Sequence, residues 1–165
     1  MGVEIERKFL VANDDWKQRV THSARMSQGY LGNTGIASVR IRVAGEQAWI
    51  NIESANPGMT RIEFEYSVPV AQGREMLRLS EQPPLEKTRY WVQEGRHTWE
   101  VDVFDGANLG LVTAELELQS EQEEFHAPTW LGREVTDEIC YYNNQLARRP
   151  FSLWEQDQRA ERDDK

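Results

Sequence analysis

The 165-residue sequence contains a single cysteine and only three histidines. Because a disulfide needs two cysteines, none can form within the chain, which suits a reducing compartment. Cys140 has no histidine near it in the sequence, so we expect a small, partly buried thiol and not a nucleophile. The histidines are scattered and no pair has the spacing of zinc ligands, so a zinc site is not expected.

Several other signals are also missing. The sequence has neither G-x-x-x-x-G-K-S/T nor G-x-G-x-x-G, so any phosphate would have to be bound by side chains and not by a glycine-rich backbone loop. No apolar run is long enough to span a membrane. Glu4 and Glu6 stand where the apolar region of a signal peptide would develop. We therefore expect a soluble, cytoplasmic protein that makes no membrane contact.

Positive charge is scarce in this chain. There are 19 Lys and Arg against 28 Asp and Glu, which gives a formal net charge of −9. Double-stranded nucleic acid is bound through clustered Lys and Arg, so this class of partner is not expected. The acidity does not exclude a small anionic ligand, because a divalent metal held by carboxylates turns an acidic site into a phosphate site.

What the sequence does have is seven short segments with a charged or polar residue at every second position. Successive side chains of a strand point to opposite faces, so each segment predicts a strand with one charged and one apolar face. The first segment places Glu4, Glu6 and Lys8 on one face. The charged or polar faces of the other six segments carry Arg40 and Arg42; Asn51 and Glu53; Arg61, Glu63 and Glu65; Lys87 and Arg89; Glu100 and Asp102; and Glu115 and Glu117.

Two architectures fit this alternation. In the first, the charges face water and the apolar faces fill a core, as in most antiparallel sheets. In the second, the strands close into a barrel with the charges inside, which is tolerable only if they pair, hold metal or surround an ionic ligand. Alternation alone does not distinguish the two, because either face can be the inner one.

The remaining segments predict a few helices and one polar end. Residues 70–79 have helical spacing between prolines, and 137–149 are expected to be helical in their second half. A capping box at Ser120 predicts a helix that ends before Pro128. Residues 130–132 are expected to form a loop, and 28–31 an extended stretch. We predict one α+β, barrel-like domain over residues 1–154, followed by a polar tail at 155–165 that we expect to be disordered.

The opening M-G-V-E-I-E-R-K-F-L-V resembles that of the CYTH family, also called the triphosphate tunnel metalloenzymes. The hallmark of this family is E-x-E-x-K in the first strand, which alone would be a weak signal. The resemblance is specific because it continues in order over residues 1–154. The matching segments are Q-G-Y-L at 28–31, V-R-I-R-V at 39–43, T-R-I-E-F-E-Y at 60–66, E-K-T-R-Y at 86–90, W-E-V-D-V-F at 99–104, A-E-L-E-L at 114–118, and E-V-T-D followed by Y-Y-N.

The resemblance implies a closed antiparallel barrel of about eight strands with a charged interior. Known members hydrolyse inorganic triphosphate, thiamine triphosphate or polyphosphate, remove an RNA 5′ phosphate, or cyclise ATP, and they need Mg²⁺ or Mn²⁺. The short bacterial members with this opening look most like inorganic triphosphatases. The implied activity is therefore metal-dependent release of phosphate from a small polyanionic substrate.

The resemblance also implies roles for the charged side chains. Arginine forks and lysine ammonium groups suit phosphate oxygens, and carboxylates suit hard cations. Among the carboxylates the resemblance favours Glu4, Glu6, Glu115 and Glu117 as metal ligands. Lys8 or Lys87 would assist catalysis as a base if a neighbour lowers its pKa. The full expected sets are Lys8, Arg40, Arg42, Arg61, Lys87 and Arg89 for substrate, and Glu4, Glu6, Glu63, Glu65, Asp102, Glu115 and Glu117 for metal.

Three positions depart from the family pattern, and each removes positive charge. Glu53 stands where relatives commonly have lysine, Cys140 replaces an expected arginine, and Trp91 replaces a frequent lysine. Two alternatives therefore stay open: a barrel that binds a phosphorylated ligand without hydrolysing it, and a class IV-like adenylate cyclase. A lipocalin-like carrier of apolar ligands would need the charged faces outside. A homodimer is also left open, although the sequence shows no decisive interface patch.

Overall fold

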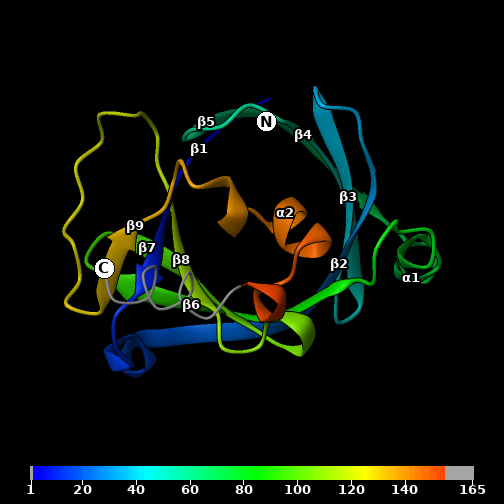
Figure 1. Cartoon of the computed structure of the whole chain (residues 1–165). Coiled ribbons are helices and arrows are strands. Elements are labelled where there is room, and N and C mark those ends of the chain that lie inside the picture. Colours follow the sequence, from blue (N-terminus) through cyan, green and yellow to red (C-terminus); the bar gives the residue numbers. More distant parts are fainter. Residues whose placement is uncertain (1, 155–165) are drawn as a thin grey trace.

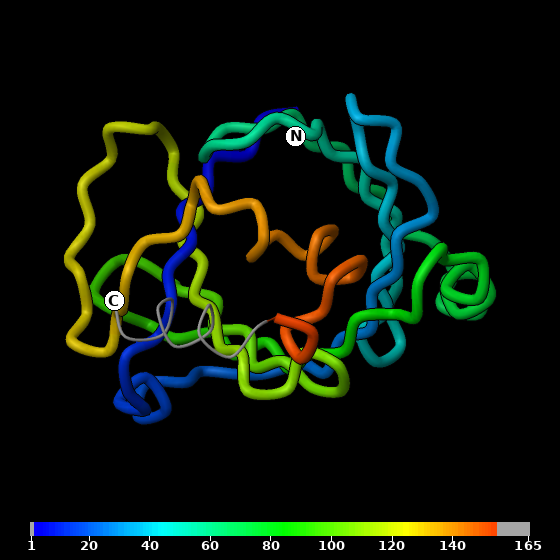
Figure 2. The backbone as a smooth tube through the Cα atoms, in the orientation of Figure 1, coloured from blue at the N-terminus to red at the C-terminus, as the bar shows by residue number. Residues whose placement is uncertain are grey.

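The computed structural model describes residues 2–154 and forms a ring of antiparallel strands (Figure 1). Helix α1 lies outside the ring, and helix α2 lies within its outline in this view (Figure 2). The strands are β1 (Gly2–Val11), β2 (Val20–Asn33), β3 (Ala37–Ala44), β4 (Gln47–Ser54), β5 (Thr60–Val68), β6 (Leu85–Glu94), β7 (His97–Phe104), β8 (Val112–Glu117) and β9 (Leu131–Glu134). The helices are α1 (Val70–Leu77), α2 (Asn143–Arg148) and the short 3₁₀ helices η1 (Asp15–Arg19), η2 (Gly106–Asn108), η3 (Ile139–Tyr141) and η4 (Phe151–Leu153).

Strand β1 closes the ring. The strand order is β5-β4-β3-β2-β6-β7-β8-β1, and β1 also pairs with β5. Glu4 of β1 lies opposite Arg61 of β5, while Glu6 lies opposite Glu117 of β8. Strand β9 adds to the far end of β1. The predicted α+β fold, a closed eight-stranded antiparallel barrel, is confirmed, with β9 as one extra strand.

The apolar faces of the strands point outward, so the barrel has the second of the two architectures that strand alternation allowed. On β1, β7 and β8 they form a core that includes Phe9, Trp99 and Leu116, packed against Trp16 and Trp130 from flanking segments. Helix α1 covers β3 and β4 on another side of the ring (Figure 1). The charged faces therefore point inward, and the lipocalin-like arrangement is wrong for this chain.

Helix α1 approaches the barrel closely at Gly73. A Cβ atom at this position would lie 2.4 Å from the Cβ of Ala48 and 3.4 Å from a methyl group of Val43. Glycine therefore sets the distance between the helix and the sheet. The predicted helix over 70–79 is confirmed, and it ends at Leu77.

One end of the barrel is filled by the residues that follow β9. The inward faces of β1 and β6 end in Leu10 and Leu85, which are both buried and share their faces with Lys8 and Lys87. We call the segment 135–154, which packs on this apolar floor, the plug. Its buried side chains and their partners on the barrel are Leu10, Leu85, Phe104, Leu111, Val135, Tyr141, Leu146, Phe151 and Trp154.

The capping-box prediction is wrong, because residues 120–127 contain no helix. The Glu123 carboxylate accepts a hydrogen bond from the Gln119 amide at 2.7 Å, and not from the Ser120 amide that a capping box would use. It also lies 2.7 Å from His97 Nε2, and Phe125 packs edge-to-face on Phe9 and Trp99. These tertiary contacts hold the segment across the barrel surface, so only a turn forms.

Two strand boundaries also differ from expectation. Strand β2 begins at Val20, well before the predicted stretch 28–31, and β9 replaces part of the loop expected near 130–132. The helical second half of 137–149 is confirmed by α2. The predicted tail at 155–165 lies outside the described residues. Within residues 2–154, no helix combines the length and apolar character needed to cross a membrane.

Candidate active site

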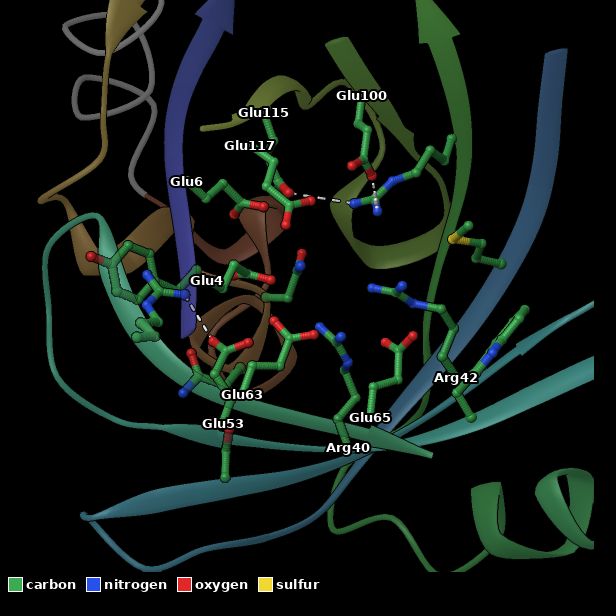
Figure 3. A pocket seen from close by; sticks show the side chains of 18 of the residues that line it. Glu4, Glu6, Arg40, Arg42, Glu53, Glu63, Glu65, Glu100, Glu115 and Glu117 are labelled. Carbon is green, nitrogen blue, oxygen red and sulfur yellow. Dashed lines mark hydrogen bonds and ion pairs between the residues drawn. The ribbon is translucent and has the colours of Figure 1, made fainter. Parts of the chain in front are cut away.

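A cavity of about 910 Å³ occupies the barrel interior above the plug. This volume is near the upper end of the range, about 300–1,000 Å³, that is typical of small-molecule sites. Figure 3 shows carboxylates and arginines from several strands pointing into it. Eleven of the thirteen predicted site residues line it: Glu4, Glu6, Lys8, Arg40, Arg42, Arg61, Glu63, Glu65, Arg89, Glu115 and Glu117.

One cluster of carboxylates joins β1, β4 and β5. Glu4, Glu53 and Glu63 each offer an oxygen, and these oxygens all lie within 4.8 Å of one another. Burial, together with the charges of Glu6 and Glu63, raises the pKa of Glu4 to about 11. Carboxylates this close resist simultaneous ionisation. A hard divalent cation with oxygen ligands would relieve that repulsion, so the donor set fits Mg²⁺ or Mn²⁺.

A second cluster joins β1, β7 and β8. Burial and the nearby charge of Glu115 raise the pKa of Glu6 well above its usual range. Burial and Glu100 raise the pKa of Glu117. Burial would also raise the pKa of Glu115, but the cations of Lys8 and Arg89 outweigh it and hold that pKa well below the usual range. The pKa values of these carboxylates are therefore shifted in opposite directions, although all of them line one cavity.

Arg40 and Arg42 form no ion pair with any residue in the range 2–154. Arg40 Nε is buried without a hydrogen-bond partner, and Arg42 Nε donates to Gln28 Oε1 at 3.2 Å. Burial and the positive charges of Arg40 and Arg89 lower the pKa of Arg42 to about 10. Figure 3 shows both guanidinium groups directed into the cavity. The charges of Glu53 and Glu63 act on Arg40, but neither carboxylate forms an ion pair with it within residues 2–154. The two close guanidinium groups can therefore bind an anion with several oxygens.

Arg61, by contrast, is already paired. Its Nη1 lies 2.8 Å from Glu53 Oε1, and its guanidinium carbon lies 4.4 Å from the ring centre of Tyr142 in the plug. The Glu53 charge contributes to a raised pKa of Arg61, although burial acts in the opposite direction. Glu53 therefore occupies Arg61, which leaves Arg40 and Arg42 as the arginines most available to an entering anion.

Lys87 and Asp102 do not line the cavity, although they share strand faces with Arg89 and Glu100, which do. Both side chains are fully buried, and Lys87 Nζ donates to Asp102 Oδ2 at 2.8 Å. Arg89 donates to both Asp102 oxygens, at 2.8 and 2.9 Å, and also pairs with Glu100. Burial lowers the pKa of Lys87 to about 7. Burial would raise the pKa of Asp102, but Arg89 and Lys87 outweigh it and keep that pKa low.

The sequence of this chain is similar to those of known proteins. A model of the CYTH domain matches residues 2–151. The chain belongs to the CYTH domain family. It is 41% identical over 152 residues to an inorganic triphosphatase of Acetivibrio thermocellus, covering 92% of this chain and 97% of that protein. It is 36% identical over 149 residues to an inorganic triphosphatase of Nitrosomonas europaea, covering 87% and 96%.

Solved structures of CYTH proteins support the same fold. A crystal structure described as that of an inorganic triphosphatase aligns with a TM-score of 0.63 and 32% sequence identity. It covers 92% of this chain and 98% of the other. The two proteins therefore share the fold over nearly the whole length of each chain.

Lys8 of the CYTH signature is held by the plug. Its Nζ donates to the Tyr141 carbonyl oxygen at 3.1 Å and lies 3.3 Å from Glu115 Oε1. The ammonium also lies 5.7 Å from the ring centre of Tyr142. The first strand thus supplies the residue, and the plug fixes where its ammonium group sits in the CYTH barrel.

The cavity of this CYTH barrel also contains residues that the sequence did not assign to the site. Glu100 pairs with Arg89. Because Glu100 stands two positions before Asp102 in a predicted strand, the sequence already placed it on the same charged face. His22 stacks on Trp91 with ring centres 4.2 Å apart, and both line the cavity. Tyr142 had no such signal, because it precedes a short helix in a segment without strand periodicity.

Proposed function

We propose that this CYTH barrel hydrolyses inorganic triphosphate in a metal-dependent reaction that releases phosphate. The observation that carries the proposal is the pair Arg40 and Arg42, which face a cavity walled by carboxylates and have no carboxylate partner within residues 2–154. An anion with several oxygens satisfies both guanidinium groups. Two relatives named as inorganic triphosphatases cover almost the whole CYTH region and support this substrate class.

The carboxylates around the cavity would hold Mg²⁺ or Mn²⁺. When bound, the metal neutralises phosphate oxygens and lets a polyanion enter an acidic cavity. Both oxygens of Asp102 already accept hydrogen bonds from Lys87 and Arg89, so we assign Asp102 to those cations. The ligands we propose are Glu4, Glu6, Glu63, Glu65, Glu115 and Glu117. Glu53 belongs to the first carboxylate cluster, but we assign it to Arg61, with which it pairs at 2.8 Å.

The chain's own cations would bind and orient the substrate. Arg40 and Arg42 receive phosphate oxygens, and Arg89 reaches the cavity from its buried partner Asp102. Phosphoryl transfer depends mainly on positioning and charge stabilisation, and we assign the terminal phosphoryl group as the one attacked. Lys8 lies on the cavity surface and is better placed than buried Lys87 to exchange a proton there. Lys87 would then hold the Asp102 carboxylate in place, and Asp102 would orient Arg89.

We further propose that the substrate is a small polyanion of the cytoplasm. The cavity is enclosed by side chains, and the chain has a net charge of −9, so an extended duplex has no basic surface to follow.

The test is phosphate release from tripolyphosphate, pyrophosphate and ATP, each with Mg²⁺, Mn²⁺ or EDTA. We expect metal-dependent release that is strongest on tripolyphosphate. Arg42→Gln should lower kcat/KM at least about tenfold, a loss of about 1.4 kcal/mol. Arg25→Gln is the matched control, because Arg25 pairs with Asp105 on the exposed outer face. Release that is unaffected by EDTA, or by Arg42→Gln, would contradict the proposal.

The alternatives give different results in the same assay. A barrel that only binds would take up tripolyphosphate in calorimetry and release no phosphate. A cyclase would convert ATP to a cyclic product and pyrophosphate, without preference for tripolyphosphate.

A further inference from the structure

The arginines that line the cavity differ in the kind of side chain that holds them. Arg61 and Arg89 each pair with a carboxylate on a neighbouring strand. Arg42 is joined to an amide instead, because its Nε donates to Gln28 Oε1 at 3.2 Å. A carboxylate orients an arginine and also cancels its charge, whereas an amide oxygen orients the guanidinium group and leaves its charge unchanged.

Strand pairing places Gln28 beside Arg42. The two residues lie opposite one another in the pairing of β2 with β3, and on its other side Gln28 lies opposite Leu85 of β6. The Gln28 side chain is fully buried and does not line the cavity, whereas Arg42 does. An entering ligand therefore meets the guanidinium group and not the amide that holds it.

The backbone of β2 is fixed at this point by contacts on its outer side. A Cβ atom at Gly29 would lie 2.8 Å from the Cβ of Ser80, so only glycine allows the segment after α1 to approach this closely. The Glu81 amide donates to the Tyr30 carbonyl oxygen at 3.1 Å. Successive strand residues face opposite sides, so these contacts hold the strand while the Gln28 side chain stays on the inner side.

The other end of the amide indicates what Gln28 contributes. Its Nε2 is buried and has no hydrogen-bond partner in the part of the chain that the structure describes. An unsatisfied buried donor destabilises a fold, and an apolar side chain of similar size would avoid that cost. The benefit of the amide therefore lies in its oxygen, which accepts the hydrogen bond from Arg42.

We propose that Gln28 is a positioning residue, which holds the Arg42 guanidinium group toward the cavity and leaves its charge available to phosphate oxygens. The inference rests on the proposed function for its substrate. The positive charges of Arg40 and Arg89 act against that of Arg42. Without the Gln28 oxygen, this repulsion would move the guanidinium group away from its place in the cavity. A cation that is fixed in advance stabilises a reacting anion better than one that must first be ordered.

The first test compares Gln28→Met and Gln28→Glu in the hydrolysis of tripolyphosphate with Mg²⁺. Gln28→Met removes the acceptor and should lower kcat/KM about three- to tenfold. Gln28→Glu keeps the acceptor and the shape but neutralises Arg42, so it should lower kcat/KM at least about tenfold. Gln93→Glu is the matched control, because it adds the same charge at an exposed position near the end of β6. A kcat/KM of Gln28→Glu equal to that of this control would overturn the proposal.

A double-mutant cycle tests whether Gln28 acts through Arg42. In an Arg42→Gln background, Gln28→Met should lower kcat/KM by less than about twofold, because the group that it positions is already gone. The same loss in both backgrounds would overturn the proposal. Circular dichroism verifies that each variant is folded, and Gln28→Leu takes the place of Gln28→Met if the latter does not fold.

Exchange of the Arg42 Nε proton with water, measured by NMR, tests the anchor without substrate. The proton should exchange at least about tenfold faster in Gln28→Met than in wild type, because its acceptor is lost. Gln93→Glu should leave the rate unchanged. If wild type releases no phosphate from tripolyphosphate, the proposed function fails and these exchange rates decide the inference by themselves. Equal rates in wild type and Gln28→Met would overturn it.

Discussion

The carboxylate of Glu53 lies 2.8 Å from the guanidinium group of Arg61, and both side chains line the barrel cavity. The family resemblance implies lysine at the position of Glu53, so the sequence predicted a carboxylate that would repel a polyanion. The ion pair gives Glu53 another role, because its carboxylate is neutralised by Arg61 on the neighbouring strand. Glu53 neutralises Arg61 inside the site, and it does so where both side chains are largely buried.

Substituting Glu53 should therefore strengthen substrate binding. In Glu53→Gln, Arg61 loses its partner and gains phosphate oxygens, so KM for tripolyphosphate should fall by about three- to tenfold, the equivalent of about 0.6–1.4 kcal/mol. Steady-state kinetics at saturating metal measures this change. Glu46→Gln is the matched control, since Glu46 pairs with Arg74 on an exposed hairpin. A KM that rises, together with a higher metal requirement, would instead make Glu53 a metal ligand.

Asp102 should contribute mainly to stability. Asp102→Asn leaves Lys87 without its buried counter-charge and leaves Arg89 with only Glu100 and Glu115, which should lower the free energy of unfolding by about 3–5 kcal/mol. Urea denaturation with metal and with EDTA should give the same loss, because Asp102 does not line the cavity. Asp105→Asn breaks an exposed pair with Arg25 and should cost less than about 1 kcal/mol. A loss seen only in the presence of metal would show that Asp102 binds it.

The plug should contribute both to the stability of the fold and to the position of the Lys8 ammonium group. Leu146 is fully buried in it, so Leu146→Ala should lower the free energy of unfolding by about 2–5 kcal/mol. Because the neighbouring Tyr141 carbonyl accepts a hydrogen bond from Lys8, kcat on tripolyphosphate should also fall. Leu153→Ala, at a position 65% exposed, should change stability by no more than about 0.5 kcal/mol. If Leu146→Ala lowers stability but leaves kcat unchanged, the packing of the plug does not determine the position of Lys8.

Acid should weaken the attachment of β9 to β1. Hydrogen bonds from Arg7 lower the pKa of Glu134 in the folded protein. A depressed folded pKa adds stability above the unfolded value, about 4.3 for glutamate, and this stability is lost as pH falls through the folded pKa. Since the pair is partly exposed, screening limits its contribution to about 1 kcal/mol.

The measurement is urea denaturation of wild type and Glu134→Gln at pH 7 and at pH 3. The variant should be about 1 kcal/mol less stable at pH 7, and the difference should shrink at pH 3. Glu75→Gln, at an exposed position of α1, provides the reference for losing an unpaired carboxylate. A difference that stays constant with pH would contradict the assignment.

Strand alternation predicted most of the barrel and most of the cavity wall. A period of two does not depend on tertiary context, so it located Glu4, Arg42 and Glu115 on their correct strand faces. It did not determine which face was inner, and only the family resemblance indicated the charged interior. The sequence also could not separate an exposed apolar face from a buried one, so it did not predict that Phe64 and Tyr66 are exposed.

Elements that depend on contacts distant in sequence were the ones missed. The turn at Ser120 has a correct local capping signal, yet Phe125 is drawn onto Trp99 and no helix follows. Strand β9 forms because Arg7 and Glu134 meet across 127 positions of sequence. Tyr142 enters the site from the plug. Its Y-Y-N segment matched the family pattern, but that match did not indicate that the plug folds back into the barrel.

The position of β1 in the ring has a consequence for how the protein is made. β1 precedes the other described strands in the sequence, yet its partners are β5, β8 and β9, which lie far along the chain. A ribosome-bound chain can pair β1 with β5 early, but the other edge of β1 has no partner until β8 emerges. Contacts of such long sequence separation form slowly. The nascent chain therefore carries an open row of charged strands for most of its synthesis, and the last residues described here complete the enclosure.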